Sequence, residues 1–144
     1  MNAAQKSLQG ARIIHIALLV ASIAYLVVAR YVTANPKGEL PIAVAGGIGL
    51  AAFSMLLVAA FLRSKLVKPG AEALRNNADD TGAATKWRAG TIVSLVFAES
   101  VVLFGMVLKM VGFSWNVSGI FYVVGILFLL AWWPKLELTA GRIC

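Results

Sequence analysis

Four long apolar runs most strongly limit what this chain of 144 residues can fold into. They cover residues 13–32, 41–62, 89–111 and 117–133. Each is close to the roughly 20 residues that a helix needs to cross a hydrocarbon core of about 30 Å. With 60% hydrophobic and 13% charged residues, a soluble domain of this size could not bury its apolar surface. The sequence therefore predicts an all-α membrane protein, an antiparallel bundle of four transmembrane helices that forms a single domain over residues 1–144.

The distribution of basic residues predicts the orientation of this bundle. With an even number of spans, both termini lie on the same side as the segment 63–88. That side carries every lysine and arginine except Arg30, Lys37 and Lys109. The positive-inside rule then predicts cytoplasmic termini and a cytoplasmic loop at 63–88. We expect a multi-pass protein of the bacterial inner membrane, with its first apolar run retained rather than cleaved as a signal peptide. Tryptophans are expected at the inner interface (Trp87, Trp132, Trp133) and at the outer one (Trp115).

The segment between the second and third runs contains helix-breaking and helix-capping residues. Pro69 and Gly70 are predicted to end the second helix, and residues 71–75 are a candidate for one helical turn. An aspartate at 79 or 80, or Thr81, is a candidate to cap an extension of the third helix. Residues 112–116 are short enough to join the third and fourth helices as a close hairpin.

Glu99 is the one acid of six that lies inside an apolar run. A charged carboxylate at the bilayer centre costs about 2.5–3.5 kcal/mol on insertion scales. Apolar surroundings therefore favour its neutral, protonated form. An acid that is neutral in lipid and charged when it meets water or a cation suits a carrier of protons or sodium ions. Glu99 is the predicted ion-binding residue.

Several polar side chains within the runs are candidates to hydrogen-bond Glu99. Ser100 follows it directly but points about 100° away on a helix, so a donor from another helix is favoured. Lys109 is ten residues further along, about 15 Å on a helix, and too distant for an ion pair. The candidates are Ser54, Tyr25, Ser94 and Ser100, with Tyr122 as a further intramembrane hydroxyl.

Small residues recur at helical spacings in the second and third runs. Small side chains let helix backbones approach closely, which is the main source of helix adhesion in lipid. The predicted helix-packing positions are Gly46, Gly47, Gly49, Gly90, Ala98 and Gly105.

Other classes of site lack their sequence signals. The single His15 and the single Cys144 form no cluster with metal-ligand or haem-ligand spacing, so we predict no catalytic residue, no metal and no cofactor. His15 is interpreted as a structural or snorkelling residue. The basic residues are not interleaved with aromatic ones on a soluble face, so nucleic acid is not a predicted partner.

The segment from Phe97 to Val107 resembles the ion-carrying helix of the rotor-ring proteolipids, subunit c of V-type and F-type ATPases. Those helices place Ala-Glu before an apolar segment, an aromatic residue and a glycine. Residues 45–52 are similar to the glycine- and alanine-rich helix that precedes it, and the likeness covers residues 41–109. The resemblance implies that Glu99 is the ion-binding carboxylate and that Gly46, Gly47 and Gly49 belong to a close-packed inner helix. In four-helix members the acid lies in the last helix, whereas here it lies in the third.

Two other functions remain open at this point. In a small accessory subunit that scaffolds a larger membrane complex, Glu99 would bond a neighbouring protein or stay protonated within the bundle. Small proton-coupled multidrug exporters also have four helices and one membrane glutamate, but in the first helix, where this chain has none. The expected partners are the lipid bilayer and other membrane subunits, in a homo- or hetero-oligomer.

Overall fold

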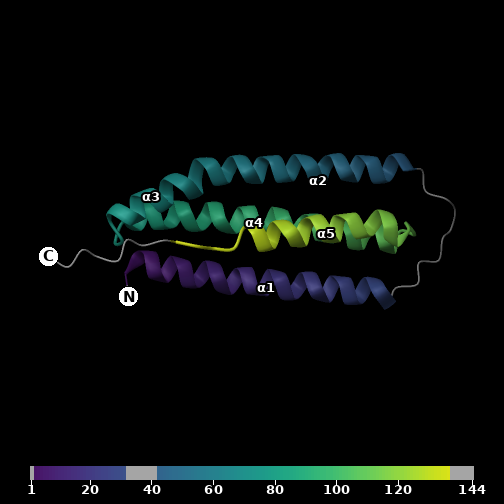
Figure 1. Ribbon diagram of the computed structural model, residues 1–144, viewed down its shortest axis with the longest axis horizontal. Coiled ribbons are helices and arrows are strands. Elements are labelled where there is room, and N and C mark those ends of the chain that lie inside the picture. The colour runs from purple at the N-terminus through teal and green to yellow at the C-terminus, as the bar shows by residue number, and fades with distance from the viewer. Residues whose placement is uncertain (1, 32–41, 137–144) are drawn as a thin grey trace.

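The computed structural model describes residues 2–31 and 42–136, and within these ranges every regular element is a helix. The elements are α1 (Ala3–Tyr31), α2 (Ile42–Leu62), the π-helix η1 (Arg63–Val67), α3 (Lys68–Asn76), α4 (Thr81–Met110) and α5 (Trp115–Ala131). The long helices run in alternating directions along the chain, so the predicted antiparallel bundle is confirmed (Figure 1).

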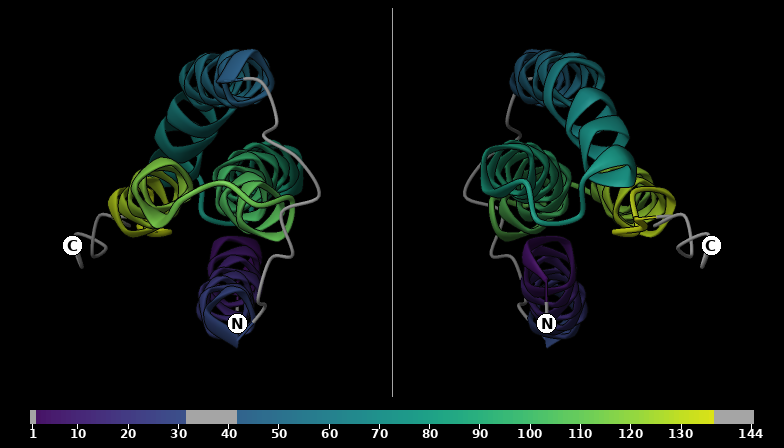
Figure 2. Two further views of the ribbon diagram at one scale, coloured as in Figure 1. Left: turned by 90° about the vertical axis from the view of Figure 1, so that its right-hand side faces the viewer. Right: turned by 90° about the vertical axis from the view of Figure 1, so that its left-hand side faces the viewer.

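Helix α4 is the centre of the bundle. Seen end-on, it lies between α1 and α2, with α5 to one side (Figure 2). It packs against α1, α2, α3 and α5, whereas α1 and α5 touch each other only lightly. Glu99 is therefore carried by the helix that contacts all three other long helices.

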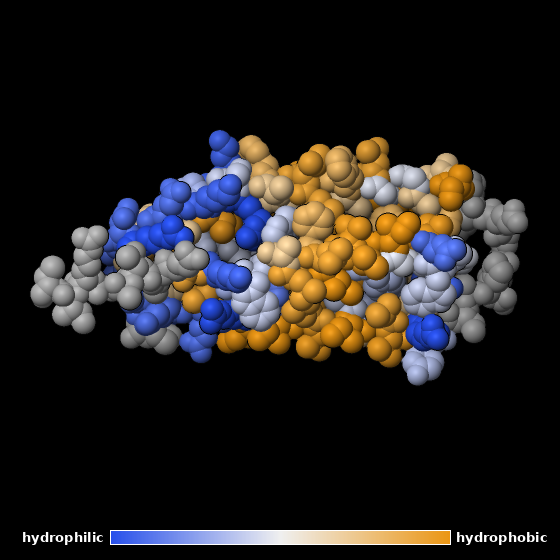
Figure 3. Space-filling view, in the orientation of Figure 1, coloured by the Kyte–Doolittle hydropathy of each residue, from blue (hydrophilic) through white to orange (hydrophobic). Residues whose placement is uncertain are grey.

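Three helical segments are long and apolar enough to cross a membrane: Ala3–Tyr31, Ile42–Asn76 and Thr81–Met110. Helix α5 is also apolar but has 17 residues. On the face shown in Figure 3, apolar side chains form a band across the middle, and hydrophilic ones gather toward the two ends. The predicted runs fall on α1, α2, α4 and α5, except that residues 32 and 41 lie outside the described residues. Lys37, the loop around it and Cys144 also lie outside them.

The prediction of a loop at 63–88 is wrong, because most of this segment is helical. Helix α2 does not end at Pro69 but continues through η1 into α3. The backbone N–H of Lys68 bonds the carbonyl of Arg63, five residues back. This widened turn directly precedes Pro69, and a π-turn is one way in which a helix accommodates the missing N–H and the ring of a proline. The helix therefore continues past the proline instead of ending at it.

Helix α3 packs closely against α4. A Cβ built on Gly70 would lie 2.9 Å from Trp87 Cβ, so only glycine permits this approach. Trp87 is 1% exposed and packs in a core cluster with Ala4, Ala11, Leu74, Ala83 and Ala84. Trp87 is therefore covered by α3 and the start of α1, and its depth in the membrane stays a prediction.

The two turns that flank α4 follow local chemistry. Asp80 caps α4, its Oδ1 accepting a hydrogen bond from the Ala83 N–H at 2.9 Å, which confirms the predicted cap. At the other end, Gly112 has φ 104°, a conformation that glycine adopts without strain. The chain reverses there, and α5 begins at Trp115, two residues before the predicted span.

The predicted packing glycines fall into two groups. A Cβ on Gly90 would lie 2.8 Å from Leu66 Cβ, and one on Gly105 would lie 2.9 Å from the Ser118 carbonyl oxygen. By contrast, positions 46 and 47 on α2 have no atom of the described chain within 4 Å of a built Cβ. Gly125 on α5, which is not among the predicted packing positions, makes the closest approach: a built Cβ there would lie 2.5 Å from Val102 Cγ2.

Candidate functional site

Glu99 lies on the side of α4 that meets α1, and its side chain is half-buried. The Tyr25 hydroxyl, from α1, donates a hydrogen bond to Glu99 Oε1 at 3.2 Å. This distance is long for an O–H···O bond, whose usual range is about 2.5–3.0 Å. The bond therefore holds the carboxyl in place weakly.

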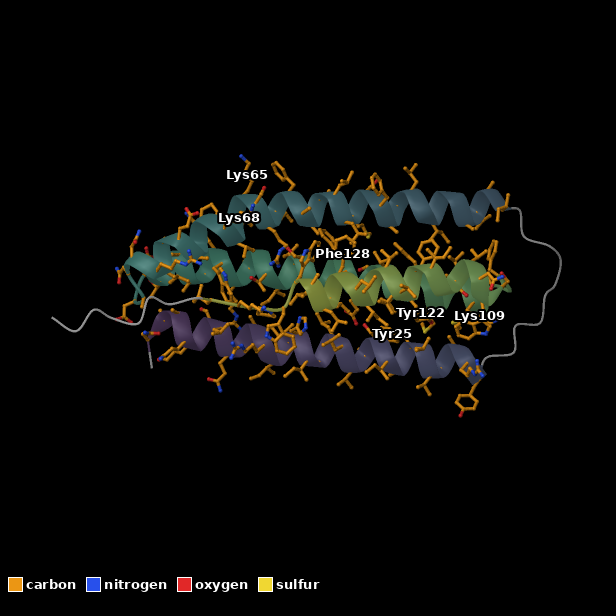
Figure 4. All side chains as sticks on the ribbon, viewed as in Figure 1. Tyr25, Lys65, Lys68, Lys109, Tyr122 and Phe128 are labelled. Atoms are coloured by element: carbon orange, nitrogen blue, oxygen red, sulfur yellow. The ribbon has the colours of Figure 1, made fainter. Side chains whose placement is uncertain are left out.

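A second tyrosine fixes the first. The Tyr122 hydroxyl, from α5, donates to the backbone carbonyl of Tyr25 at 3.3 Å. Tyr122 is buried, and its ring lies beside Trp115 with centroids 6.2 Å apart. Figure 4 shows Tyr25 and Tyr122 close together between α1 and α5, with Lys109 nearer the end of the bundle. Three helices thus converge on the carboxyl: α4 carries it, α1 donates to it, and α5 positions the donor.

The immediate surroundings of this pair are apolar. The buried residues of the adjoining core cluster are Ala29, Leu95, Ala98, Val102, Tyr122 and Leu129. No basic side chain pairs with Glu99 in the part of the chain that the structure describes. Lys109, the nearest cation along α4, instead places its Nζ 5.1 Å from the centre of the Trp115 ring. A neutral phenol, rather than a cation, therefore faces the carboxyl.

The three serine candidates do not reach Glu99. Each donates to the carbonyl four residues earlier in its own helix: Ser54 to Leu50 at 2.9 Å, Ser94 to Gly90 at 2.7 Å and Ser100 to Val96 at 2.9 Å. Ser94 also lies 3.4 Å from the Ala59 carbonyl of α2. A serine inside a helix satisfies its hydroxyl locally in this way, whereas the longer tyrosine side chain reaches a neighbouring helix.

One buried polar residue close to Tyr25 is not among the predicted candidates. Ser22 lies one helical turn before Tyr25 on the same face of α1, is fully buried, and its Oγ has no hydrogen-bond partner among the described residues. The signal was present in the sequence, since residues three apart share a helix face. His15, further down this face, is also fully buried and packs edge-to-face on Trp133 with ring centroids 4.6 Å apart.

The chemistry available at this site is proton or cation exchange at one carboxyl. Among residues 2–31 and 42–136, no group of three His, Cys, Asp or Glu side chains is arranged to hold a metal ion. A carboxyl and a phenol can exchange protons with each other or with water, and both remain within an apolar setting.

Comparisons with protein-family models, with curated proteins and with solved structures found no match. The structure thus defines a class: a small all-helical protein with three helices long and apolar enough to span a membrane. The likeness of residues 41–109 to subunit c stays a prediction from the sequence.

Proposed function

We propose that this chain is a small integral membrane protein in which Glu99 reversibly binds a proton or another small cation, similar in manner to a rotor-ring proteolipid. The observation that carries this proposal is a half-buried carboxyl on the central helix whose described hydrogen-bond donor is a neutral phenol, Tyr25, at 3.2 Å.

A neutral donor leaves both charge states of the carboxyl accessible. A lysine or arginine at this place would hold the carboxylate permanently ionised, because separating a buried ion pair is costly. The Tyr25 hydroxyl stabilises the carboxylate by one long hydrogen bond, so protonation of Glu99 loses only a small stabilising free energy. The apolar surroundings favour the neutral state, and a charged state needs water or a cation nearby. Glu99 can therefore alternate between the two as its surroundings change.

The proposed setting is an assembly with other membrane subunits. An ion carrier works only if its carboxyl is exposed in turn to an environment where it binds the ion and to one where it releases it. A single bundle of this size provides only one environment for Glu99. Helix α2 has an exposed apolar face, on which Gly46 and Gly47 lie open. A flat face of this kind allows a neighbouring helix to approach closely.

The test is labelling with a hydrophobic carbodiimide, which attacks protonated carboxyls in lipid. In proteoliposomes we expect one modified residue, Glu99, and labelling that slows as pH rises. Slowing by sodium at constant pH would identify sodium as the bound ion. The control is Glu72→Gln, which removes an exposed acid on α3 and should leave labelling unchanged. Absence of labelling at every pH, or ion flux that is unaltered in Glu99→Gln, would contradict the proposal.

A second candidate function rests on the same hydrogen bond. Because Tyr25 and Glu99 join α1 to α4 within one chain, Glu99 is also placed to act as a structural acid in an accessory subunit. Glu99→Gln would then lower stability or prevent co-purification with other membrane subunits, while ion flux in the assembled complex stays unchanged. The two candidates are separated by measuring flux and assembly in the same preparation.

The orientation with both termini in the cytoplasm belongs to this proposal. The only cysteine, Cys144, provides a direct assay. In intact spheroplasts a membrane-impermeant maleimide should leave it unlabelled, and permeabilisation should expose it. Labelling without permeabilisation would reverse the proposed orientation.

A further inference from the structure

Two adjoining hollows lie between α1 and α5, toward the end of the bundle that carries Arg30. Each has a volume of about 350 Å³. Leu26 and Trp115 line both of them, and we refer to the two adjoining hollows together as the groove. The groove exists because α1 and α5 each pack on α4 but barely touch each other. Gly119 widens it, since no described atom lies within 4 Å of a Cβ built there.

The two halves of the groove differ in chemistry. The half nearer the helix ends is lined by Arg30, Tyr31 and Trp115, a cation and two aromatic rings with polar edges. The half nearer the middle is lined by Gly119, Val123 and other apolar groups of α1 and α5. Among its lining residues only Tyr122 and Trp115 have a polar side-chain group, and the Tyr122 hydroxyl donates to the Tyr25 carbonyl. A polar end that continues into an apolar channel matches the headgroup and the acyl chain of an amphiphilic molecule.

Among the described residues, the charged side chains at this end are the cations Arg30 and Lys109. Lys109 Nζ lies 5.1 Å from the Trp115 ring, so Trp115 has a cation on α4 as a neighbour and shares the groove with Arg30. The acids of the described residues lie elsewhere. Glu72, Asp79 and Asp80 are on α3 and the turn that follows it, at the opposite end, and Glu99 is in the interior of α4.

We propose that this groove is a binding site for a phospholipid with a net negative headgroup. Its phosphate would lie at Arg30, and one acyl chain would lie along α5 past Gly119 and Val123. Trp and Tyr are the side chains typical of headgroup depth, where they pack on lipid and hydrogen-bond at the same time. Basic residues near the membrane surface favour anionic over zwitterionic lipids, because a zwitterionic headgroup brings a cation toward Arg30 and Lys109. The site does not use Glu99, so it is independent of the proposed function.

The experiment is native mass spectrometry of the full chain, released from nanodiscs that contain equal amounts of phosphatidylglycerol and phosphatidylcholine. The wild type should retain one phosphatidylglycerol in preference to phosphatidylcholine. Gly119→Leu fills the apolar half and should abolish this retention. Arg30→Gln should weaken it about fivefold, the effect of one basic side chain at a membrane surface.

Matched controls keep the test specific. Gly47→Leu adds the same side chain at an equally open glycine on α2, and Arg12→Gln removes an exposed arginine from the other end of α1. Both should retain lipid as the wild type does, and circular dichroism should show all four variants fully helical. Equal retention of the two lipids by the wild type would overturn the proposal. So would wild-type retention by Gly119→Leu, or a dimer lost on that substitution, which would assign the groove to a second copy of the chain.

Discussion

Helices α2 and α4 have apolar windows of equal mean hydropathy, yet they occupy opposite positions in the bundle. In α4, 44% of the window is buried inside the molecule, whereas in the α2 segment only 17% is. Apolarity therefore cannot be what places α4 at the centre. In a membrane, lipid tails are as apolar as leucine, so burial of hydrophobic side chains gives helices no preference for protein over lipid.

The difference lies in how closely each helix lets its neighbours approach. Gly90 and Gly105 on α4 meet atoms of other helices at distances that a Cβ would not tolerate, and Val102 is approached in the same way from Gly125. On α2, Gly46 and Gly47 are equally small but open. Small residues thus stabilise packing only where a partner surface fits them.

Substitution of Gly125 should have the largest effect. A Cβ there would lie 2.5 Å from Val102 Cγ2 and 2.9 Å from the backbone N of the same residue, which cannot move without shifting α4. Gly125→Val should lower the free energy of unfolding by about 3 kcal/mol, the upper part of the range for overpacking. Unfolding in mixed micelles measures this, with Gly119→Val on the open face of the same helix as the control. Equal destabilisation by both variants would show that the glycine contact does not hold α5 to α4.

Gly90 and Gly46 provide the direct comparison of α4 with α2. Gly90→Ala should cost about 1–2 kcal/mol, because the added methyl meets Leu66 Cβ at 2.8 Å. Gly46→Ala adds the same methyl in open space and should leave stability unchanged or raise it slightly, since alanine has the higher helix propensity. Thermal unfolding of the two variants in one detergent checks this. A destabilised Gly46→Ala would indicate that α2 packs on a second subunit under those conditions.

The hydrogen bond between α1 and α4 should contribute less. Tyr25→Phe removes the donor to Glu99 and should cost about 0.6 kcal/mol, the average for hydrogen bonds between helices in a membrane. The control is Ser54→Ala on α2, whose hydroxyl bonds only its own helix, at Leu50, and whose loss should be neutral. Carbodiimide labelling of Glu99 in Tyr25→Phe should become faster, because the carboxylate loses its donor. Unchanged stability and labelling would mean that the bond does not form in the membrane.

The smallest effect on stability is expected at Pro69, the residue predicted from the sequence to end the second helix. Pro69 is exposed and lies in the first turn of α3, so Pro69→Ala should change stability by no more than about 0.5 kcal/mol. Leu57→Pro, in the interior of α2, should cost about 3 kcal/mol through the lost bond and the ring clash. Helical content from circular dichroism and unfolding midpoints measure both. A large loss in Pro69→Ala would show that the proline itself holds the π-turn in place.

Several features were predictable because their cause is local. The four apolar runs became helices since a backbone in lipid must satisfy its hydrogen bonds internally. Asp80 caps α4 because its side chain reaches an N–H three residues on, and Gly112 turns the chain because it tolerates φ 104°. Glu99 was singled out by its apolar neighbours in sequence alone. Each of these depends on residues within a few positions of one another.

The features that the sequence did not predict depend on contacts between distant segments. Pro69 was read as a stop, but the π-turn before it and the contact of Gly70 with Trp87 keep the chain helical and fold α3 onto α4. The burial of Trp87 by α3 and the start of α1 likewise depends on contacts between distant segments. Among the candidate partners of Glu99, the sequence could not separate Tyr25 from the serines.

Hydropathy and backbone hydrogen bonding act residue by residue, so the amino-acid sequence alone predicts a set of apolar helices with one acid among them. Packing between helices is what makes α4 central, brings Tyr25 to Glu99 and leaves a groove between α1 and α5. Lipid tails interact equally well with helices of equal hydropathy. Which helix becomes central therefore depends on how side chains fit together at close approach, and this fit involves several segments at once.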